Sequence, residues 1–248
     1  MTSPSTVVVM PTYNEADTLA GTWRDLRAQL PDVTLLVVDD GSPDGTGAIA
    51  DALAAGDANM SVMHRPAKAG LGAAYIAGFR WALDHGAAYI VEMDADGSHR
   101  AIDLAAMLAR AADADLTIGS RWVRGGRVEN WSWPRILLSR AGNTYVRAML
   151  GMPVRDATAG FRVFKASVLA SMDLSDVHSA GYCFQVDMTR RVFRAGLTIA
   201  EHPITFVERR AGKSKMSNAI VREALWRVTV WGLADRLRRL TRPGRTAG

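Results

Sequence analysis

Short β-branched and aliphatic runs alternate with longer helix-like segments through the first 120 residues, and this alternation constrains the fold more than any other feature. We expect strands at 6–10, 35–40, 61–65, 89–96 and 115–120, and helices near 16–29, 44–55, 71–85 and 101–112. Strands and helices that alternate in this way are typical of a mostly parallel sheet covered by helices on both faces. The sequence therefore predicts an α/β fold that binds its ligands at the carboxyl ends of the strands.

A different pattern follows Ser120. A loop rich in glycine and tryptophan leads to a predicted helix at 135–150 and then to a turn-rich stretch at 151–164. A further helix is predicted near 181–195, and an extended run follows it at 197–208. We interpret this half of the chain as an addition to the α/β core that forms the side of the site where a second substrate, the acceptor, binds.

The last segment, residues 218–248, begins with a predicted amphipathic helix. Leucine, valine and isoleucine recur at helical spacing to about Leu240, with Trp226 and Trp231 among arginines. Charged residues interrupt this stretch too often for a membrane span, but a basic helix with tryptophans can lie on anionic lipid. A C-terminal helix that packs on its own domain explains the same pattern, so both interpretations stay open.

The two halves of the chain carry opposite charge. Residues 1–120 hold 7 Lys/Arg and 16 Asp/Glu, a balance of −9, whereas residues 121–248 hold 23 Lys/Arg and 9 Asp/Glu, a balance of +14. An acidic half can hold a metal and, through it, a phosphorylated small molecule. The basic half also contains five of the seven tryptophans, a composition that suits anionic lipid headgroups or nucleic acid.

The cysteine, histidine and hydropathy patterns limit the cellular compartment and the kind of metal site that can be expected. Cys183 is the single cysteine and cannot pair within the chain, and the five histidines stand apart rather than at metal-ligand spacings. The N-terminus lacks the basic start and apolar core of a signal peptide, and no charge-free apolar run reaches the ~20 residues that cross a bilayer. We therefore expect a cytoplasmic protein that does not span the membrane and holds no zinc.

Asp94 and Asp96 stand one residue apart at the end of a predicted apolar strand, where the turn that leaves the strand can aim both carboxylates at one point. Oxygen ligands suit Mg²⁺ or Mn²⁺. Such a metal keeps open positions for a diphosphate and stabilises the charge that develops on a diphosphate leaving group. A turn that caps the next helix is the alternative explanation for a pair of this kind.

Two further polar clusters close predicted strands. Asp39 and Asp40 precede the turn sequence GSPDGT, where one carboxylate can bind a base or a ribose and Asp44 is expected to cap a helix. The first strand ends in PTYNE at 11–15, whose tyrosine and glutamate can grip a nucleotide base. Because the clusters follow three strands of one predicted sheet, their joint pattern is more specific than any single member.

Eight ordered blocks between residues 7 and 217 resemble the dolichol- or polyprenol-phosphate mannose synthases of glycosyltransferase family 2. They are PTYNE, VVDDGSPDGT, MDADGSH, GSRWVRGG, NWSWPRILLSRAGN, RDATAGFRVF, GYCFQVDM and PITFVERRAGKSK. The resemblance implies a GT-A catalytic domain over residues 1–217, with the amphipathic helix of 218–248 as a docking segment. It also implies inversion at the anomeric carbon.

The resemblance also implies a set of donor and metal contacts. The guanosine and ribose of GDP-mannose are expected on Pro11, Tyr13, Glu15, Val38 and Asp40. The metal and the diphosphate are expected on Asp94, Ala95 and Asp96. Some members carry a further glutamine ligand at the position of Ser98, for which we expect a weaker or water-mediated metal contact.

Arg121, Arg209 and Lys215 match positions at which relatives set cations against phosphate groups. Arg121, Arg209 and Lys215 are expected on the donor phosphates, and Arg121 and Arg135 on the acceptor phosphate. A lipid monophosphate is already an anionic nucleophile and needs no strong general base. This agrees with a sequence in which we find no Ser-His-Asp order, GxSxG, HExxH or P-loop motif.

The expected activity is transfer of mannose from GDP-mannose to a polyprenyl, dolichyl-type phosphate, with Asp94, Asp96, Arg121 and Arg135 as the catalytic residues. Some relatives end in membrane-spanning helices and others are recruited by small membrane proteins; the chain resembles the second group, so the resemblance implies docking by the C-terminal helix, by a membrane protein, or by both. The expected partners are therefore the cytoplasmic face of a membrane, to which the chain binds peripherally, and a membrane protein.

Two alternatives remain at this stage. The first is a polyprenyl-phosphate glucosyltransferase that uses UDP-glucose, because pocket contacts choose the base and the sugar. The second is a non-catalytic binder of nucleotide sugars or nucleic acid, which a pI of about 9.7 permits. The acidic clusters would repel a polyanion, so we expect no nucleic acid partner.

Overall fold

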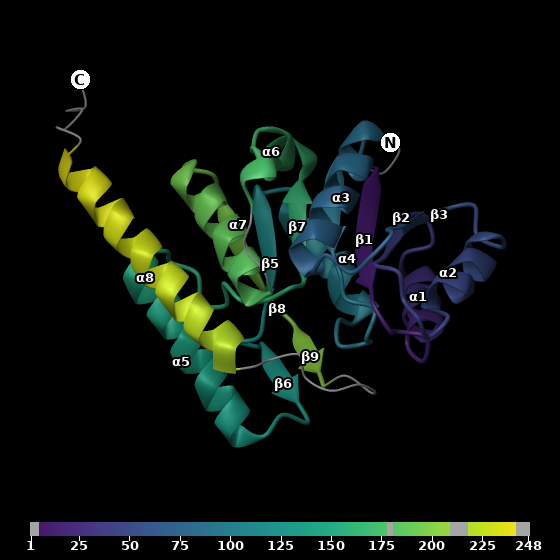
Figure 1. The fold of residues 1–248 in the computed structure, drawn as a ribbon, viewed down its shortest axis with the longest axis horizontal. Coiled ribbons are helices and arrows are strands. Elements are labelled where there is room, and N and C mark those ends of the chain that lie inside the picture. The colour runs from purple at the N-terminus through teal and green to yellow at the C-terminus, as the bar shows by residue number, and fades with distance from the viewer. Residues whose placement is uncertain (1–4, 178–180, 209–217, 242–248) are drawn as a thin grey trace.

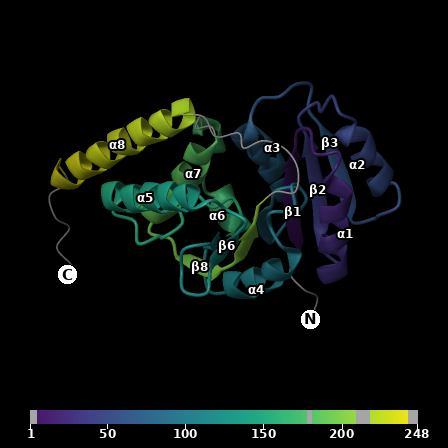
Figure 2. The same ribbon diagram turned by 90° about the horizontal axis from the view of Figure 1, so that it is seen from below.

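The computed structural model describes residues 5–177, 181–208 and 218–241 (Figures 1 and 2). The strands are β1 (Thr6–Thr12), β2 (Thr34–Asp39), β3 (Met60–His64), β4 (Tyr89–Glu92), β5 (Leu116–Ser120), β6 (Arg127–Glu129), β7 (Arg162–Lys165), β8 (Ile199–Pro203) and β9 (Thr205–Val207). The α-helices are α1 (Leu19–Gln29), α2 (Thr46–Ala54), α3 (Leu71–Asp84), α4 (Ala101–Ala111), α5 (Trp133–Leu150), α6 (Ala166–Ala170), α7 (Tyr182–Arg194) and α8 (Asn218–Thr241). One 3₁₀ turn, η1, covers Leu174–Asp176.

Seven strands form one sheet in the order β3-β2-β1-β4-β7-β5-β8, and β6 pairs with β9 beside it. Neighbouring strands run parallel except at β7, which is antiparallel to both β4 and β5. Helices α1, α2 and α4 pack together on one face, and α3, α6 and α7 lie over the other (Figures 1 and 2). The predicted α/β architecture, a mostly parallel sheet flanked by helices, is confirmed.

The strands contribute apolar side chains to both faces of the sheet, as parallel strands covered on both sides must. Along β1, Val8 and Met10 join the core under α1 and α4, whereas Val7 and Val9 join the core under α3. Helix α3 approaches the sheet closely at Gly78, where a Cβ would lie 2.3 Å from a methyl group of Val9. The buried sheet thus forms a rigid support for the loops that leave its carboxyl edge.

Strand β7 corrects the sequence-based prediction, because the stretch 151–164 was expected to be turns. Its first residue, Arg162, is fully buried in the middle of the sheet, where it pairs in register with Glu92 of β4. The Arg162 Nε lies 3.9 Å from a Glu92 carboxylate oxygen. A charged residue breaks the apolar run that marks a buried strand, and its partner lies 70 positions away in the sequence.

Two predicted strands also have different bounds. The strand expected at 89–96 ends at Glu92, so Asp94 and Asp96 lie on the loop that follows rather than in the strand. The extended run at 197–208 divides at Pro203 into β8 of the main sheet and β9 of the small sheet. The first difference places the two aspartates on a loop at the carboxyl edge of the sheet, whereas the second leaves only the buried Ile204 between β8 and β9.

Helix α8 packs against α5 and α7 (Figures 1 and 2). Val228 is buried in the main core, and Arg190 of α7 donates two hydrogen bonds to Asp235 of α8, at 2.9 and 2.7 Å. The Tyr145 and Thr229 hydroxyls bond each other across α5 and α8. The predicted helix is therefore present and one side of it packs on the domain. No helix in the described ranges combines the length and the apolar character of a membrane span.

Candidate active site

A cleft with a volume of about 470 Å³ opens where β1, β2 and β4 end. Polar side chains from all three strand ends line it, together with residues from the basic half of the chain. The predicted site residues that line this cleft are Pro11, Tyr13, Glu15, Asp40, Asp94, Ala95, Asp96, Arg121 and Arg135. The structure therefore brings together nine of the predicted residues from five separate segments.

Four predicted residues are not among those that line the cleft. The Val38 side chain is fully buried in the apolar core, so a ligand could be reached there through the backbone alone. Ser98 is also fully buried, and its hydroxyl has no hydrogen-bond partner. Arg209 and Lys215 lie outside the described residues. Their roles stay predictions.

Asp94 lies on the loop after β4, and Tyr75 of α3 and His99 hold it from two sides. The Tyr75 hydroxyl donates to Asp94 Oδ1 at 3.2 Å, and the Asp94 backbone N–H donates to Nδ1 of His99 at 3.0 Å. Burial and the neighbouring carboxylate raise the pKa of Tyr75 well above its ordinary value, so the phenol keeps the proton that it donates. Since Nδ1 accepts this bond, the other ring nitrogen, Nε2, faces Asp94 Oδ2 at 3.9 Å.

Asp96 is turned back by Gly97, whose φ of +75° favours glycine. Its Oδ1 accepts the Ser98 backbone N–H at 3.0 Å, which is the turn-capping contact that the sequence left as an alternative. Both carboxylates nevertheless line the cleft, and the orphaned Ser98 hydroxyl is buried two residues away. This set of oxygens fits a hard divalent cation that takes its remaining ligands from a bound phosphate. Within the described ranges, no cluster of three or more His, Cys, Asp or Glu side chains is placed to enclose a metal by itself.

The opposite end of the cleft is built on Asp40. Its carboxylate accepts Arg65 Nη1 at 2.5 Å and the Ala69 backbone N–H at 3.2 Å, and these contacts fix the loop that precedes α3. On this loop Lys68 places its Nζ 3.8 Å from the centre of the Tyr13 ring, a cation–π contact. Tyr13 and Lys68 therefore form a flat, cationic rim beside a buried carboxylate.

A buried charge pair lies beneath the acidic loop. Burial raises the pKa of Glu92 to about 7, and the nearby Arg162 and Gln185 offset this rise in part. Burial also lowers the pKa of Arg162 to about 10, and the Glu92 charge opposes this change. Arg162 is held further by the backbone carbonyls of Ala157 and Ala159. The pair ties β4, which carries the acidic loop, to the segment before β7.

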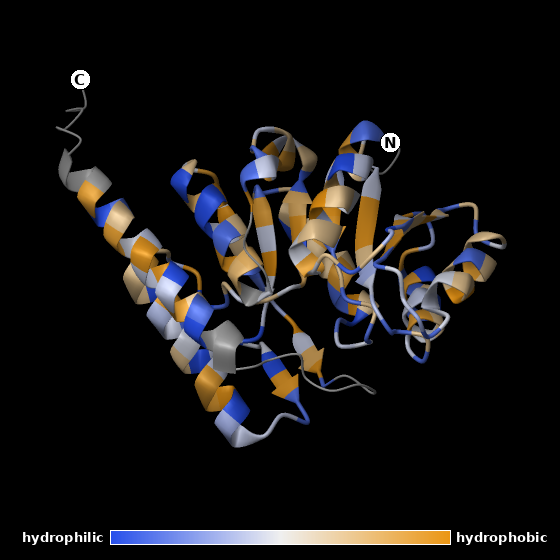
Figure 3. Ribbon diagram, viewed as in Figure 1, coloured by the Kyte–Doolittle hydropathy of each residue, from blue (hydrophilic) through white to orange (hydrophobic). Residues whose placement is uncertain are grey.

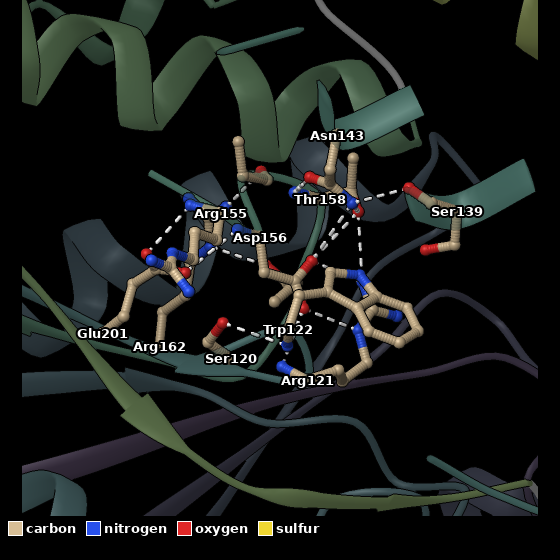
Figure 4. A network of polar contacts seen from close by, with 12 residues as sticks. Ser120, Arg121, Trp122, Ser139, Asn143, Arg155, Asp156, Thr158, Arg162 and Glu201 are labelled. Atoms are coloured by element: carbon tan, nitrogen blue, oxygen red, sulfur yellow. Dashed lines mark hydrogen bonds and ion pairs between the residues drawn. The ribbon is translucent and has the colours of Figure 1, made fainter. Parts of the chain in front are cut away.

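Arg121 is held in the cleft wall by a second buried network (Figure 4). Its Nε and Nη2 donate to the two Asp156 oxygens at 2.8 and 2.7 Å, and its backbone N–H donates to Asp156 Oδ2 at 2.9 Å. Thr158 accepts a further bond from Nη2 at 3.1 Å. Asn143 of α5 then bonds both Asp156 and Thr158. The guanidinium orientation is thus set before any ligand arrives.

Arg135 approaches the cleft from the start of α5. Its guanidinium stacks 4.0 Å from the centre of the Trp131 ring and bonds the Glu208 carboxylate. The Glu208 contact is partly solvent-exposed. A phosphate can therefore compete with Glu208 for this arginine at a modest cost.

An apolar pocket with a volume of about 120 Å³ adjoins the cleft. Four residues, Arg121, Trp131, Arg135 and Thr158, line both cavities. The far wall of the pocket is built from α5, α7 and α8 and includes Leu138, Val146, Val186, Ala224, Leu225 and Val228. The two arginines therefore stand between a polar cavity and an apolar one.

Sequence reasoning missed several residues that shape the site. Lys68, His99, Trp131 and Gln185 line the cleft, and Tyr75 supports Asp94 from below. Their signals were weak because a single lysine in a loop, a lone histidine and a buried glutamine recur throughout ordinary cores and surfaces. Asp156 and Thr158 are not among the predicted site residues either, because the link from Arg121 to Asp156 crosses 35 residues of sequence.

The family model for glycosyl transferase family 2 matches residues 7–172, more than half of the chain. The chain belongs to this family. A polyprenol monophosphomannose synthase of Mycolicibacterium smegmatis is 52% identical over 236 residues, which cover 94% of this chain and 89% of the relative. An undecaprenyl-phosphate mannosyltransferase of Micrococcus luteus is 53% identical over 230 residues, 93% of this chain and 95% of the relative.

A solved glycosyltransferase structure shares the fold. A mannosyltransferase of Pyrobaculum calidifontis, solved with GDP-mannose and Mn²⁺, superposes with a TM-score of 0.62 at 19% identity. The match covers 99% of this chain and 66% of that one. At this identity the likeness establishes the GT-A-type fold of the chain, and the predicted fold family is confirmed.

Proposed function

We propose that this chain transfers mannose from GDP-mannose to a polyprenyl phosphate and forms polyprenyl-phosphate mannose. Both curated relatives described above are named for mannose transfer to a polyprenyl lipid, and each aligns over nearly its whole length. The observation that carries the proposal is the pair of joined cavities, one polar with an acidic loop and one apolar, which meet at Arg121 and Arg135. Such a site suits one nucleotide-sugar substrate and one substrate with a phosphate head and a hydrocarbon tail.

In this proposal the polar cleft holds GDP-mannose. Tyr13 and Lys68 offer a flat, cationic rim for the base, and Asp40 lies beside them at the end of β2. Pro11 and Glu15 line the same end of the cleft. The diphosphate then lies toward Asp94 and Asp96, whose loop is held by Tyr75 and His99.

Asp94 and Asp96 would hold Mg²⁺ or Mn²⁺, with Ser98 as a further candidate ligand. A divalent cation at this loop supplies positive charge to the diphosphate as it leaves the sugar. The chain contributes rigidity, because Tyr75 and His99 fix Asp94 and Gly97 fixes the turn between Asp96 and Ser98. Rigid ligands reduce the reorganisation needed when charge develops.

The acceptor phosphate would bind between Arg121 and Arg135, with the polyprenyl chain in the apolar pocket. Arg121 is preoriented by Asp156, and Arg135 exchanges Glu208 for the phosphate. The phosphate is itself the nucleophile, so catalysis rests on alignment with the sugar and on stabilisation of the leaving diphosphate. The proposal therefore assigns no residue as a general base.

We propose further that α8 and the start of α5 rest on an anionic membrane. Trp226, Val230, Leu233 and Leu237 recur at helical spacing on α8, and all are exposed, Trp226 by 70%. Trp133 and Leu137 continue the exposed apolar surface on the adjacent α5. Figure 3 shows hydrophobic and hydrophilic positions in alternation along α8. Arg222 and Arg236 are exposed on the same helix, and Leu225 lines the apolar pocket, which connects this surface to the acceptor site.

A donor panel tests the proposal. Radiolabelled GDP-mannose, UDP-glucose and UDP-GlcNAc are each incubated with polyprenyl phosphate in detergent, with Mg²⁺, Mn²⁺ or EDTA, for the wild type and Asp96→Ala. We expect a lipid product from GDP-mannose alone, lost with EDTA and reduced at least a hundredfold in the variant. Product from UDP-glucose instead would overturn the sugar assignment, and no product from any donor with membranes added would overturn the enzymatic function.

A further inference from the structure

A second polar cavity, distinct from the cleft and from the apolar pocket, lies beside α5. It is open to solvent, has a volume of about 200 Å³ and is lined by Trp122, Arg140, Asn143, Thr144, Arg147 and Arg155. None of these six residues lines the cleft or the apolar pocket. The function proposed above gives this cavity no task.

The lining of this cavity is cationic. Three of its six residues are arginines and none is acidic. Among the described residues, no carboxylate forms an ion pair with the side chains of Arg140, Arg147 or Arg155. Nearby carboxylates are already engaged, since Asp156 bonds Arg121, and Glu201 accepts the backbone N–H groups of Arg155 and Asp156. The cavity therefore concentrates positive charge that the chain does not neutralise.

The arrangement differs from an ordinary solvated face of a helix in two respects. Arg140 and Arg147 lie two turns apart on one side of α5, and Arg155 comes from the loop after it, so the cations surround a hollow rather than point apart. The Arg140 guanidinium also stacks 4.9 Å from the centre of the Trp122 ring, which restricts its rotamers before a ligand binds. Planar, preordered guanidinium groups bind phosphate oxygens in a bidentate manner.

The cavity also lies close to the acceptor side of the cleft. Asn143 is part of its wall, and the Asn143 amide donates to Thr158, which lines the cleft and bonds Arg121. Trp122 follows Arg121 directly in the sequence. An anion in this cavity would thus sit behind the residues that orient Arg121, without contact to the proposed reacting groups.

We propose that this cavity binds a phosphate group, either as a soluble phosphomonoester or as the headgroup of an anionic phospholipid. Three arginines, the Thr144 hydroxyl and the Trp122 ring supply donors and a flat wall for such a group. Mutual repulsion of three cations in one hollow falls when a group with two or more anionic oxygens enters. The inference does not depend on which sugar the cleft transfers.

The test compares two charge-matched triple variants of the full chain. The cavity variant is Arg140→Gln, Arg147→Gln and Arg155→Gln, and the control variant changes Arg24, Arg80 and Arg110, three exposed arginines on α1, α3 and α4, to glutamine. Each loses three positive charges, so a non-specific charge effect would be equal in both. Circular dichroism and melting temperature confirm that both are folded.

Binding is measured in two arms, by calorimetry with sn-glycerol 3-phosphate and by flotation with vesicles of phosphatidylglycerol or of phosphatidylcholine. We expect the cavity variant to lose at least tenfold in affinity for one of the two phosphate sources relative to the wild type and the control variant. Loss with glycerol phosphate alone identifies a soluble ligand, and loss with phosphatidylglycerol vesicles identifies a lipid headgroup. Equal binding of the cavity and control variants in both arms overturns the proposal.

Discussion

Replacement of Asp156 by asparagine removes one charge from the network that holds Arg121 and is expected to destabilise the fold by about 3–5 kcal/mol, the usual cost of breaking a buried ion pair. Asp156 is fully buried and Arg121 is 6% exposed, so water cannot replace the lost partner. Both carboxylate oxygens accept donors: Oδ2 takes the Arg121 backbone N–H and Nε, and Oδ1 takes Nη2, Asn143 and Thr158. Whichever way the asparagine amide is turned, its NH₂ group takes the place of one of these two oxygens and faces N–H or O–H donors that it cannot accept.

Urea unfolding followed by circular dichroism measures this loss. The control is Glu129→Gln, which breaks the solvent-exposed pair of Arg127 and Glu129 and should cost less than about 1 kcal/mol. The double variant Arg121→Gln, Asp156→Asn removes both charges and should recover part of the loss, because no uncompensated charge stays buried. If Asp156→Asn unfolds within 0.5 kcal/mol of the wild type, on the order of ordinary surface changes, the account of a preoriented Arg121 is refuted.

Three further outcomes follow from the same structure. Tyr75→Phe removes the hydrogen bond to Asp94 and should weaken Mn²⁺ binding about tenfold in calorimetric titrations with GDP present; unchanged affinity would remove Tyr75 from the site. Because the folded-state pKa of Glu92 is raised to about 7 from 4.5, its contribution to stability is full below pH 4.5 and is lost as the pH rises to 7. The unfolding free energy of the wild type should therefore fall by on the order of 3 kcal/mol between pH 4.5 and 7, and that of Glu92→Gln should not. The same pH dependence of the unfolding free energy in both proteins would contradict this. The double variant Trp226→Ser, Leu233→Ser should reduce flotation with anionic vesicles at least fivefold, whereas Ile102→Ser, at an exposed position on α4, should not; equal flotation of the wild type and both variants would argue against the α8 surface.

The parallel sheet and the polar loops at its edge could be predicted from the sequence because both are local signals. Val7, Val8 and Val9 are β-branched and buried in the structure, as residues of a central strand are expected to be. The polar residues that follow such a strand in the sequence then lie at its end. Asp40, Asp94 and Asp96 were placed together by the rule that carboxyl ends of parallel strands meet at one edge. The fold therefore followed from pattern, and part of the site followed from the fold.

Contacts between distant segments escaped the sequence. Arg162 lies in a buried strand because Glu92 is opposite it, and neither residue signals the other along the chain. The link from Arg121 to Asp156 depends in the same way on how the turn before β7 meets the end of β5. Helix α8 illustrates a different limit, since its apolar pattern was compatible with packing on the domain and with contact to lipid. In the structure Val228 packs inward while Trp226 stays exposed on the same helix.

The central claim is that one site joins a mannose donor in the polar cleft to a lipid phosphate whose chain enters the apolar pocket. Initial rates of mannose transfer from GDP-mannose to a long-chain polyprenyl phosphate test it for the wild type, Ala224→Trp and Ala234→Trp. Ala224 lines the pocket, whereas Ala234 is on the same helix but does not line it. The account predicts that Ala224→Trp raises the KM for the lipid at least tenfold and leaves the KM for GDP-mannose unchanged, with wild-type values for Ala234→Trp. Equal lipid KM values in all three proteins, or no mannose transfer by the wild type, would contradict it.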